Sequence, residues 1–195
     1  MSNDRRKPEL PSIEALEAEI SRKKHKQNQH HLFRNAIYAL ITVAAVTALV
    51  AVLFVPILKT YGSSMSPTLE DGEIVAAIKT KDAKCGDVIA FYYNNKIFIK
   101  RVIALGGSVV DMDENGNISV DGVPLDEPYL TEKAYGNGDV EFPFEVPEGT
   151  YFVLGDNRVN AADSRNSILG CVDPENMLGR VVFRAWPLSR FGSIH

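Results

Sequence analysis

The feature that most constrains this chain is the uncharged run at residues 36–58, which reads AIYALITVAAVTALVAVLFVPIL. As an α-helix rising about 1.5 Å per residue, it would be roughly 34 Å long, enough to cross a hydrocarbon core of about 30 Å. A helix buried in a protein core normally carries a polar stripe, whereas this run is interrupted only by Thr42 and Thr47. A cleavable signal peptide has a shorter apolar region behind a shorter basic start. The run therefore predicts a permanent transmembrane helix.

The charges that flank this run predict its orientation. The segment before it is crowded with basic residues, namely Arg22, Lys23, Lys24, Lys26 and Arg34. On the other side Lys59 stands alone, and the next basic residue is Lys79. Because short basic flanks stay on the cytoplasmic side, residues 1–35 are expected in the cytoplasm and residues 59–195 outside it. The expected localisation is the cell membrane, with a single pass.

The segment after the helix is typical of a mainly β domain. Six stretches are rich in β-branched and aromatic residues and are separated by turn residues: EIVAAIK, VIAFYY, IFIKRVIAL, ISVDG, TYFVLG and RVVFRAW. We expect an antiparallel β-barrel or sandwich. Residues 106–149 are richer in Gly, Pro, Asp and Glu, which predicts an inserted β excursion.

Net charge bears on possible nucleic-acid partners, and cysteine spacing bears on possible disulfide bonds. Residues 59–195 carry a net charge of −7, and phosphate backbones need a positive surface, so no nucleic-acid partner is expected. The two cysteines, Cys85 and Cys171, are far apart and have no CxxC partner. We expect free, partly buried thiols, although sequence cannot show whether the two meet.

The placement of histidine narrows the possible chemistry. The four histidines are His25, His30, His31 and His195; three precede the membrane run and one is the last residue. The body of the β domain therefore has no imidazole for a Ser-His-Asp triad, and no zinc ligand set. No glycine-rich phosphate loop is present either. We expect neither a metal nor a cofactor.

A serine nucleophile without histidine needs another base, and a neutral lysine can serve if burial lowers its pKa. Six lysines follow Lys59: Lys79, Lys81, Lys84, Lys96, Lys100 and Lys133. Only Lys100 is embedded in an apolar strand, at residues 97–103. The alternative is that Lys100 lies on an edge strand and extends its amine to water. The strand pattern alone leaves both open.

The candidate nucleophile lies directly after the membrane run, where residues 62–69 read GSSMSPTL. A turn of small residues can bend tightly and expose a hydroxyl beside backbone N–H groups. The alternative is a flexible linker that leaves the membrane. The composition of the turn does not choose between Ser63, Ser64 and Ser66.

Taken together, four ordered segments resemble the conserved boxes of type I signal peptidases, most closely the Gram-positive form. They are GSSMSPTL at 62–69, GDVI at 86–89, IKRV at 99–102, and GDNR through DSR at 155–165. In that family the nucleophilic serine immediately precedes the methionine and the lysine is the general base. The resemblance therefore implies a Ser64–Lys100 dyad, and it covers the chain from about residue 33 to the C-terminus.

The resemblance also implies the substrate and the surroundings of the site. The expected activity is that of a membrane-bound serine endopeptidase that cleaves signal peptides from secreted preproteins after small-x-small motifs. Its partners would be preproteins and the lipid bilayer, and it would need no metal. Three residues would line substrate pockets (Met65, Leu69 and Ile99), and four would be structural beside the site (Arg101, Asp156, Asp163 and Arg165). Asp163 and Arg165 would form an ion pair.

Three positions depart from the family pattern. Val159 and Ala161 stand in the last box, and Ala161 replaces a serine that commonly orients the lysine. Gly62 replaces a serine that assists the oxyanion in some members, which leaves the Ser64 backbone N–H as the implied donor. One alternative is thus a weak or inactive paralogue that acts in binding or assembly at the membrane. Another is a cytoplasmic autoproteolytic regulator, which the uncharged run argues against.

Overall fold

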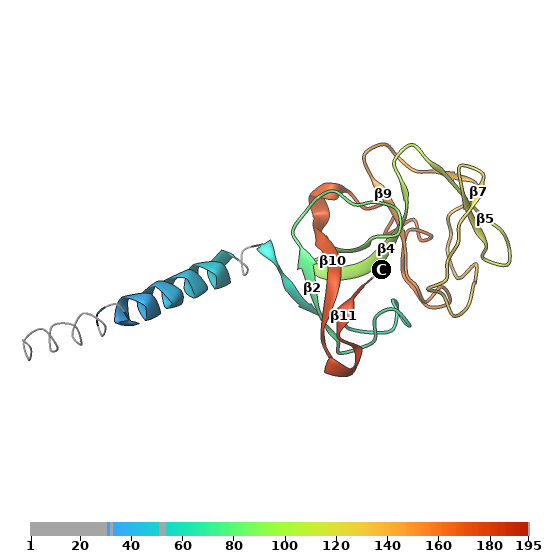
Figure 1. Cartoon of the computed structure of the whole chain (residues 1–195). Helices are drawn as coiled ribbons and strands as arrows, with labels where there is room; N and C mark the ends of the chain where they lie inside the picture. Colours follow the sequence, from blue (N-terminus) through green and yellow to red (C-terminus); the bar gives the residue numbers. More distant parts are fainter. Residues whose placement is uncertain (1–30, 32, 51–53, 195) are drawn as a thin grey trace, which may run out of the picture. The chain divides into compact units, whose positions relative to one another are not determined.

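The computed structural model describes residues 31, 33–50 and 54–194, so most of the predicted segment 1–35, and His195, lie outside the described residues. The chain divides into two compact units, Met1–Ala51 and Val52–His195 (Figure 1). Each unit is described by itself below.

The described part of the first unit is a helix that is exposed on all sides. Among the described residues, Phe33–Val50 is the one helix that is long and apolar enough to cross a membrane, judged by length and composition alone. Its two threonine hydroxyls stay within the helix, since Thr42 donates to the Tyr38 carbonyl at 2.8 Å and Thr47 to the Val43 carbonyl at 2.9 Å. Neither threonine therefore exposes an unpaired hydroxyl to an apolar solvent. Ile57 and Leu58, at the end of the apolar run, lie in a β-strand.

The second unit is built from two antiparallel sheets. The larger has seven strands in the order β1-β2-β10-β3-β4-β9, with β11 paired to β10. Their bounds are β1 Ile57–Lys59, β2 Ile74–Ile78, β3 Val88–Tyr93, β4 Lys96–Leu105, β9 Tyr151–Leu154, β10 Met177–Trp186 and β11 Gly192–Ser193. Two short 3₁₀ helices, Pro174–Asn176 and Leu188–Arg190, flank β10.

The smaller sheet has four strands in the order β7-β6-β5-β8. They are β5 Val109–Met112, β6 Ile118–Val120, β7 Val123–Pro124 and β8 Phe144–Glu145, so all four come from within residues 106–149. Buried side chains of β5 and β6 pack in one cluster with Phe152 and Leu154 of β9 and Ile103 of β4. The small sheet is thus attached to the large one through β4 and β9.

The predicted mainly antiparallel β fold is confirmed, and the six predicted stretches correspond to β2, β3, β4, β6, β9 and β10. Turn chemistry explains the central hairpin: Asn94 and Asn95 both have positive φ, 46° and 61°, as a two-residue turn between β3 and β4 requires. The strands that sequence missed, β1, β5, β7, β8 and β11, have four residues or fewer.

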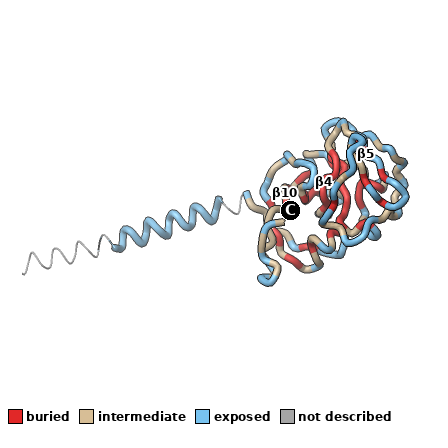
Figure 2. Tube along the Cα trace, turned by 45° about the vertical axis from the view of Figure 1, so that its right-hand side comes forward, coloured by how far each residue is buried: buried red, intermediate tan, exposed pale blue. Residues whose placement is uncertain are grey.

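Strand β3 is buried on both faces. Val88 and Ala90 of β3 pack in one hydrophobic cluster, whereas Ile89 and Phe91 pack in another. Buried residues also gather along the neighbouring β4 (Figure 2). Strand β4 pairs with both β3 and β9, and its residues 100–104 are buried, which include two charged side chains.

Cys85 and Cys171 are free thiols, as expected, but only Cys171 is partly buried, since Cys85 is exposed.

Candidate active site

The candidate nucleophile lies on a short turn that is fastened to the core. Ser66 donates its backbone N–H to the Ser63 carbonyl at 3.0 Å, and Leu69 donates to the Met65 carbonyl at 2.8 Å. Met65 and Leu69 are buried in a hydrophobic cluster. With its neighbour Met65 held in the core, Ser64 is half-buried and its position is constrained. The turn is therefore not the flexible linker that its composition also allowed.

The Lys100 side chain meets this turn from β4. Its Nζ donates to Ser64 Oγ at 2.7 Å. Lys100 is 1% exposed, and β4 is an interior strand. The alternative of an edge-strand lysine that reaches water is therefore wrong.

Burial lowers the pKa of Lys100 from 10.5 to about 8, because a low-dielectric surrounding disfavours the ammonium. Asp163 and Asp156 oppose this by attraction, and Arg165 adds to it by repulsion. At pH 7 a lysine with a pKa of about 8 is neutral in about one molecule in ten, against about one in three thousand at 10.5. Lys100 is thus a usable base near neutral pH.

The turn after β9 packs directly against both residues. Asn157 donates its backbone N–H to the Ser64 carbonyl at 3.1 Å and its side-chain amide to the Ser63 carbonyl at 3.2 Å. A Cβ added to Gly155 would lie 2.5 Å from the Ser64 carbonyl oxygen and 3.4 Å from Lys100 Nζ. Only glycine therefore allows this turn to approach so closely. The Ala161 methyl occupies the neighbouring space, against Gly155, and offers Lys100 no hydroxyl.

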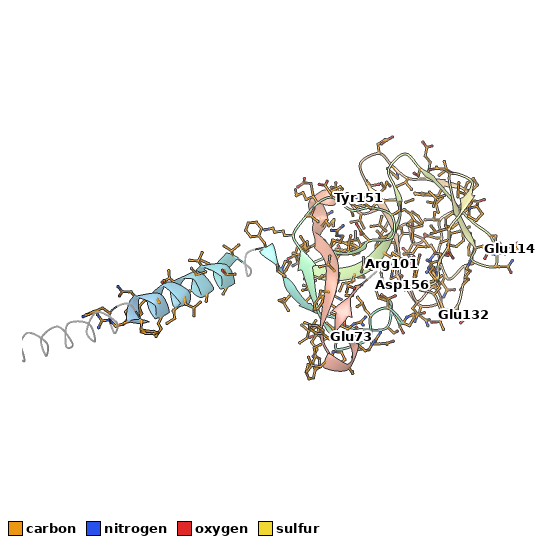
Figure 3. All side chains as sticks on the ribbon, in the orientation of Figure 1. Glu73, Arg101, Glu114, Glu132, Tyr151 and Asp156 are labelled. Atoms are coloured by element: carbon orange, nitrogen blue, oxygen red, sulfur yellow. The ribbon has the colours of Figure 1, made fainter. Side chains whose placement is uncertain are left out.

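Two buried ion pairs surround the dyad. Arg101 binds Asp156 through two contacts, Nε to Oδ1 at 2.9 Å and Nη2 to Oδ2 at 2.7 Å (Figure 3). Arg165 binds Asp163 in the same fashion at 2.8 and 2.9 Å. Asp163 also accepts the Gly155 N–H at 3.0 Å, so this pair holds the Gly155 turn.

A cleft of about 630 Å³ opens beside Ser64. Its lining comes mainly from two segments, residues 57–62 and residues 95–99. The three predicted pocket residues, Met65, Leu69 and Ile99, all contribute to it. An extended peptide laid along this cleft would pass the Ser64 hydroxyl.

The structure adds functional neighbours that sequence analysis did not single out. Thr68 donates its hydroxyl to Asp156 at 2.5 Å, and Asn157 holds the Ser64 carbonyl. Both lie inside the quoted motifs, so the motifs were the available signal. Glu127, which binds Arg158, lies in the excursion, where no motif pointed to it. Within the described residues, no group of three or more His, Cys, Asp or Glu side chains is placed to hold a metal.

Several known proteins are similar to this chain in sequence. Residues 33–186 match the family model described as signal peptidase, peptidase S26. The chain is 39% identical over 150 residues to signal peptidase IB of Staphylococcus aureus, covering 67% of this chain and 77% of the relative. It is 35% identical over 184 residues to signal peptidase I of Bacillus licheniformis, covering 87% and 97%. A crystal structure of a signal peptidase I from Enterococcus faecalis is 31% identical and covers 51% of this chain and 96% of that one, with a TM-score of 0.44.

Proposed function

Because the chain belongs to the signal peptidase family, peptidase S26, and is thus a peptidase, we propose that it is a membrane-bound serine endopeptidase that removes signal peptides from secreted preproteins. Ser64 is the nucleophile and Lys100 the general base. The observation that carries this assignment is the 2.7 Å contact between Ser64 Oγ and the buried Lys100 Nζ. A serine hydroxyl is a weak nucleophile, and an adjacent base activates it for attack on a carbonyl carbon.

The reaction follows from this geometry in two halves. Neutral Lys100 accepts the Ser64 proton as Oγ attacks the scissile carbonyl, and the Ser64 backbone N–H stabilises the oxyanion. The lysine ammonium then protonates the leaving amine, which frees the mature N-terminus and leaves an acyl-enzyme. Lys100, neutral again, takes a proton from water, and the resulting attack releases the signal peptide and returns the proton to Ser64.

The cleft supports a preference for small side chains before the scissile bond. Met65 and Leu69 reach it from the buried side of the nucleophile turn, and Ile99 comes from β4 next to Lys100. Apolar residues that line a cleft discriminate between substrate side chains by their size. Cleavage after small-x-small motifs is the specificity that we propose.

The helix Phe33–Val50 supports a role in placing the enzyme at its substrate. We propose that it spans the membrane, with the basic N-terminal segment in the cytoplasm and the β domain outside. Confinement to the plane of the bilayer raises the effective concentration of enzyme and membrane-bound preprotein.

The test is to express the wild-type chain or Ser64→Ala with a secreted preprotein and to measure how much mature protein forms. We expect processing by the wild type and none by Ser64→Ala. Equal processing by both would exclude Ser64 as the nucleophile. If neither cleaves the preprotein but both bind it, the inactive-paralogue alternative suggested by Ala161 would be favoured.

A further inference from the structure

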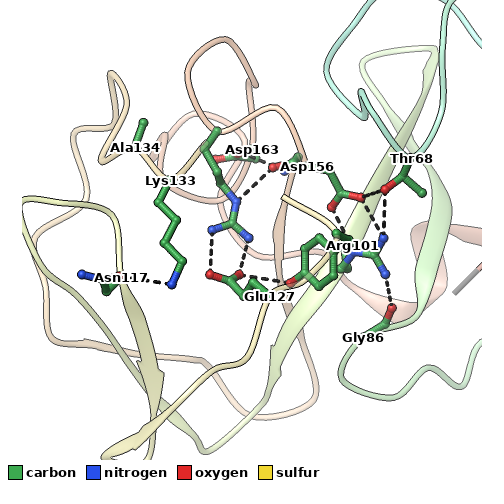
Figure 4. A network of polar contacts seen from close by, with 12 residues as sticks. Thr68, Gly86, Arg101, Asn117, Glu127, Lys133, Ala134, Asp156 and Asp163 are labelled. Atoms are coloured by element: carbon green, nitrogen blue, oxygen red, sulfur yellow. Dashed lines mark hydrogen bonds and ion pairs between the residues drawn. The ribbon is translucent and has the colours of Figure 1, made fainter. Parts of the chain in front are cut away.

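A buried carboxylate from the excursion reaches the catalytic unit. Glu127 lies between β7 and β8, and its side chain is fully buried. It binds the equally buried guanidinium of Arg158, with Oε1 2.5 Å from Nη2 and Oε2 3.4 Å from Nη1 (Figure 4). A buried arginine needs such a counter-charge, because an unpaired charge is very costly away from water.

Arg158 also binds the turn that packs against the dyad. Its Nε donates to the Gly155 carbonyl at 3.1 Å. The neighbouring Asn157 donates to the Ser64 backbone carbonyl, and a Cβ added to Gly155 would lie 3.4 Å from Lys100 Nζ. The contact from Glu127 to Arg158 therefore continues through one peptide segment to the Ser64 backbone and the Lys100 side chain.

The same carboxylate reaches a second arginine through Tyr129. The Tyr129 hydroxyl donates to Glu127 Oε1 at 3.1 Å. The Tyr129 ring lies over the Arg101 guanidinium, 3.9 Å from ring centroid to Cζ, and Arg101 in turn binds Asp156. Both arginines are thus contacted by one short segment of the excursion, residues 127–129 (Figure 4).

We propose that Glu127 is a positioning residue for the reaction: through Arg158 it holds the turn at residues 155–158 against Ser64 and Lys100. The proposal rests on the function proposed above. It assigns the excursion a part in catalysis, since the carboxylate that compensates Arg158 comes from there.

The pH dependence makes this role separable from a general loss of folding. The charged groups that act on Lys100 are Asp163, Asp156 and Arg165. Glu127 and Arg158 are not among them, so removal of the Glu127 charge affects the Lys100 pKa through the position of the turn. If the turn loosens, water reaches Lys100 and its pKa rises toward 10.5.

The experiment compares Glu127→Gln with Asp126→Asn in the full chain, using a signal-peptide substrate and the pH dependence of kcat/KM. Asp126 is the exposed neighbour and serves as the matched charge-removal control. For Glu127→Gln we expect kcat to fall about tenfold with KM nearly unchanged. The ascending limb should move to higher pH by about half a unit, because a loosened turn exposes Lys100 to water. Asp126→Asn should match the wild type.

A limb that stays in place or moves to lower pH in Glu127→Gln overturns the proposal. If that variant does not fold, Glu127→Asp replaces it, because it keeps the charge but shortens the reach. We then expect a lower kcat and a smaller shift of the limb to higher pH, and a kcat equal to that of Asp126→Asn overturns the proposal. Loss of the proposed function itself is recognised separately, since the wild type would then process no substrate.

Discussion

At the scale of single residues, the site depends on what burial does to one amine. Lys100 has an opposing pair of acids, Asp156 and Asp163, whose attraction favours its charged form. Desolvation outweighs that attraction, so the net shift is downward. This balance would allow Lys100 to act as the base that we propose, in a domain whose one histidine is the last residue.

The pH dependence of the wild type tests this balance. Activity needs the neutral amine, so kcat/KM should rise with pH through an ascending limb centred near the Lys100 pKa of about 8. Lys100→Arg should be inactive at every pH, since a guanidinium stays charged. The measurement is cleavage of a peptide substrate between pH 6 and 10, a range set by Lys100's ordinary and lowered pKa. A limb near pH 4 to 5 would instead indicate a carboxylate base.

At the scale of elements, the site is a meeting of one strand with two turns. β4 carries Lys100 and Arg101, the turn at residues 62–69 carries Ser64, and the turn after β9 closes over both. Gly155 decides how closely that last turn approaches. A residue without a side chain at position 155 is therefore a condition for this close approach to the dyad.

Gly155→Ala should reduce kcat by about a hundredfold, since its methyl would push the turn away from the Ser64 carbonyl. Gly179→Ala is the matched control, because its added methyl would clash with the Ile78 carbonyl group, at a distance from the dyad. Both variants should lose thermal stability, which thermal unfolding measures. Only Gly155→Ala should lose turnover per folded molecule, and equal turnover by the two would contradict the assignment.

At the scale of the whole molecule, the candidate site lies within the β unit, and we propose that the helix attaches that unit to the membrane. The dyad, the cleft and both ion pairs around the dyad all lie within Val52–His195. The three hydrophobic clusters are also drawn from this unit. Catalysis and membrane attachment are therefore expected to be separable.

Removal of residues 1–53 should leave cleavage of a soluble peptide within about twofold of the full chain, because the site is intact. Processing of a preprotein embedded in vesicles should fall by at least about tenfold, because the membrane no longer concentrates the enzyme. Fusion of the truncated chain to an unrelated membrane-spanning helix should restore it. Failure of that fusion, with the peptide activity intact, would mean that the native helix does more than anchor.

Much of the fold and the site could be predicted because the signals are local. An uncharged run, an alternating strand and an Asn-Asn turn each express backbone geometry within a few residues. The four boxes pointed to Ser64 and Lys100, and the structure places them 2.7 Å apart. Short strands such as β7 and β8 were missed because two residues show no period.

The sequence by itself predicted an apolar helix, a mainly β domain and, through the resemblance of four motifs to a family pattern, a Ser64–Lys100 pair. Only the tertiary structure decided which of two adjacent acids belongs to the buried network beside Ser64 and Lys100. Asp126 and Glu127 are adjacent acids that look alike in sequence, yet one is exposed and the other is buried on Arg158. The physical reason is that burial and ion pairing depend on contacts between distant segments, and no local pattern encodes these contacts.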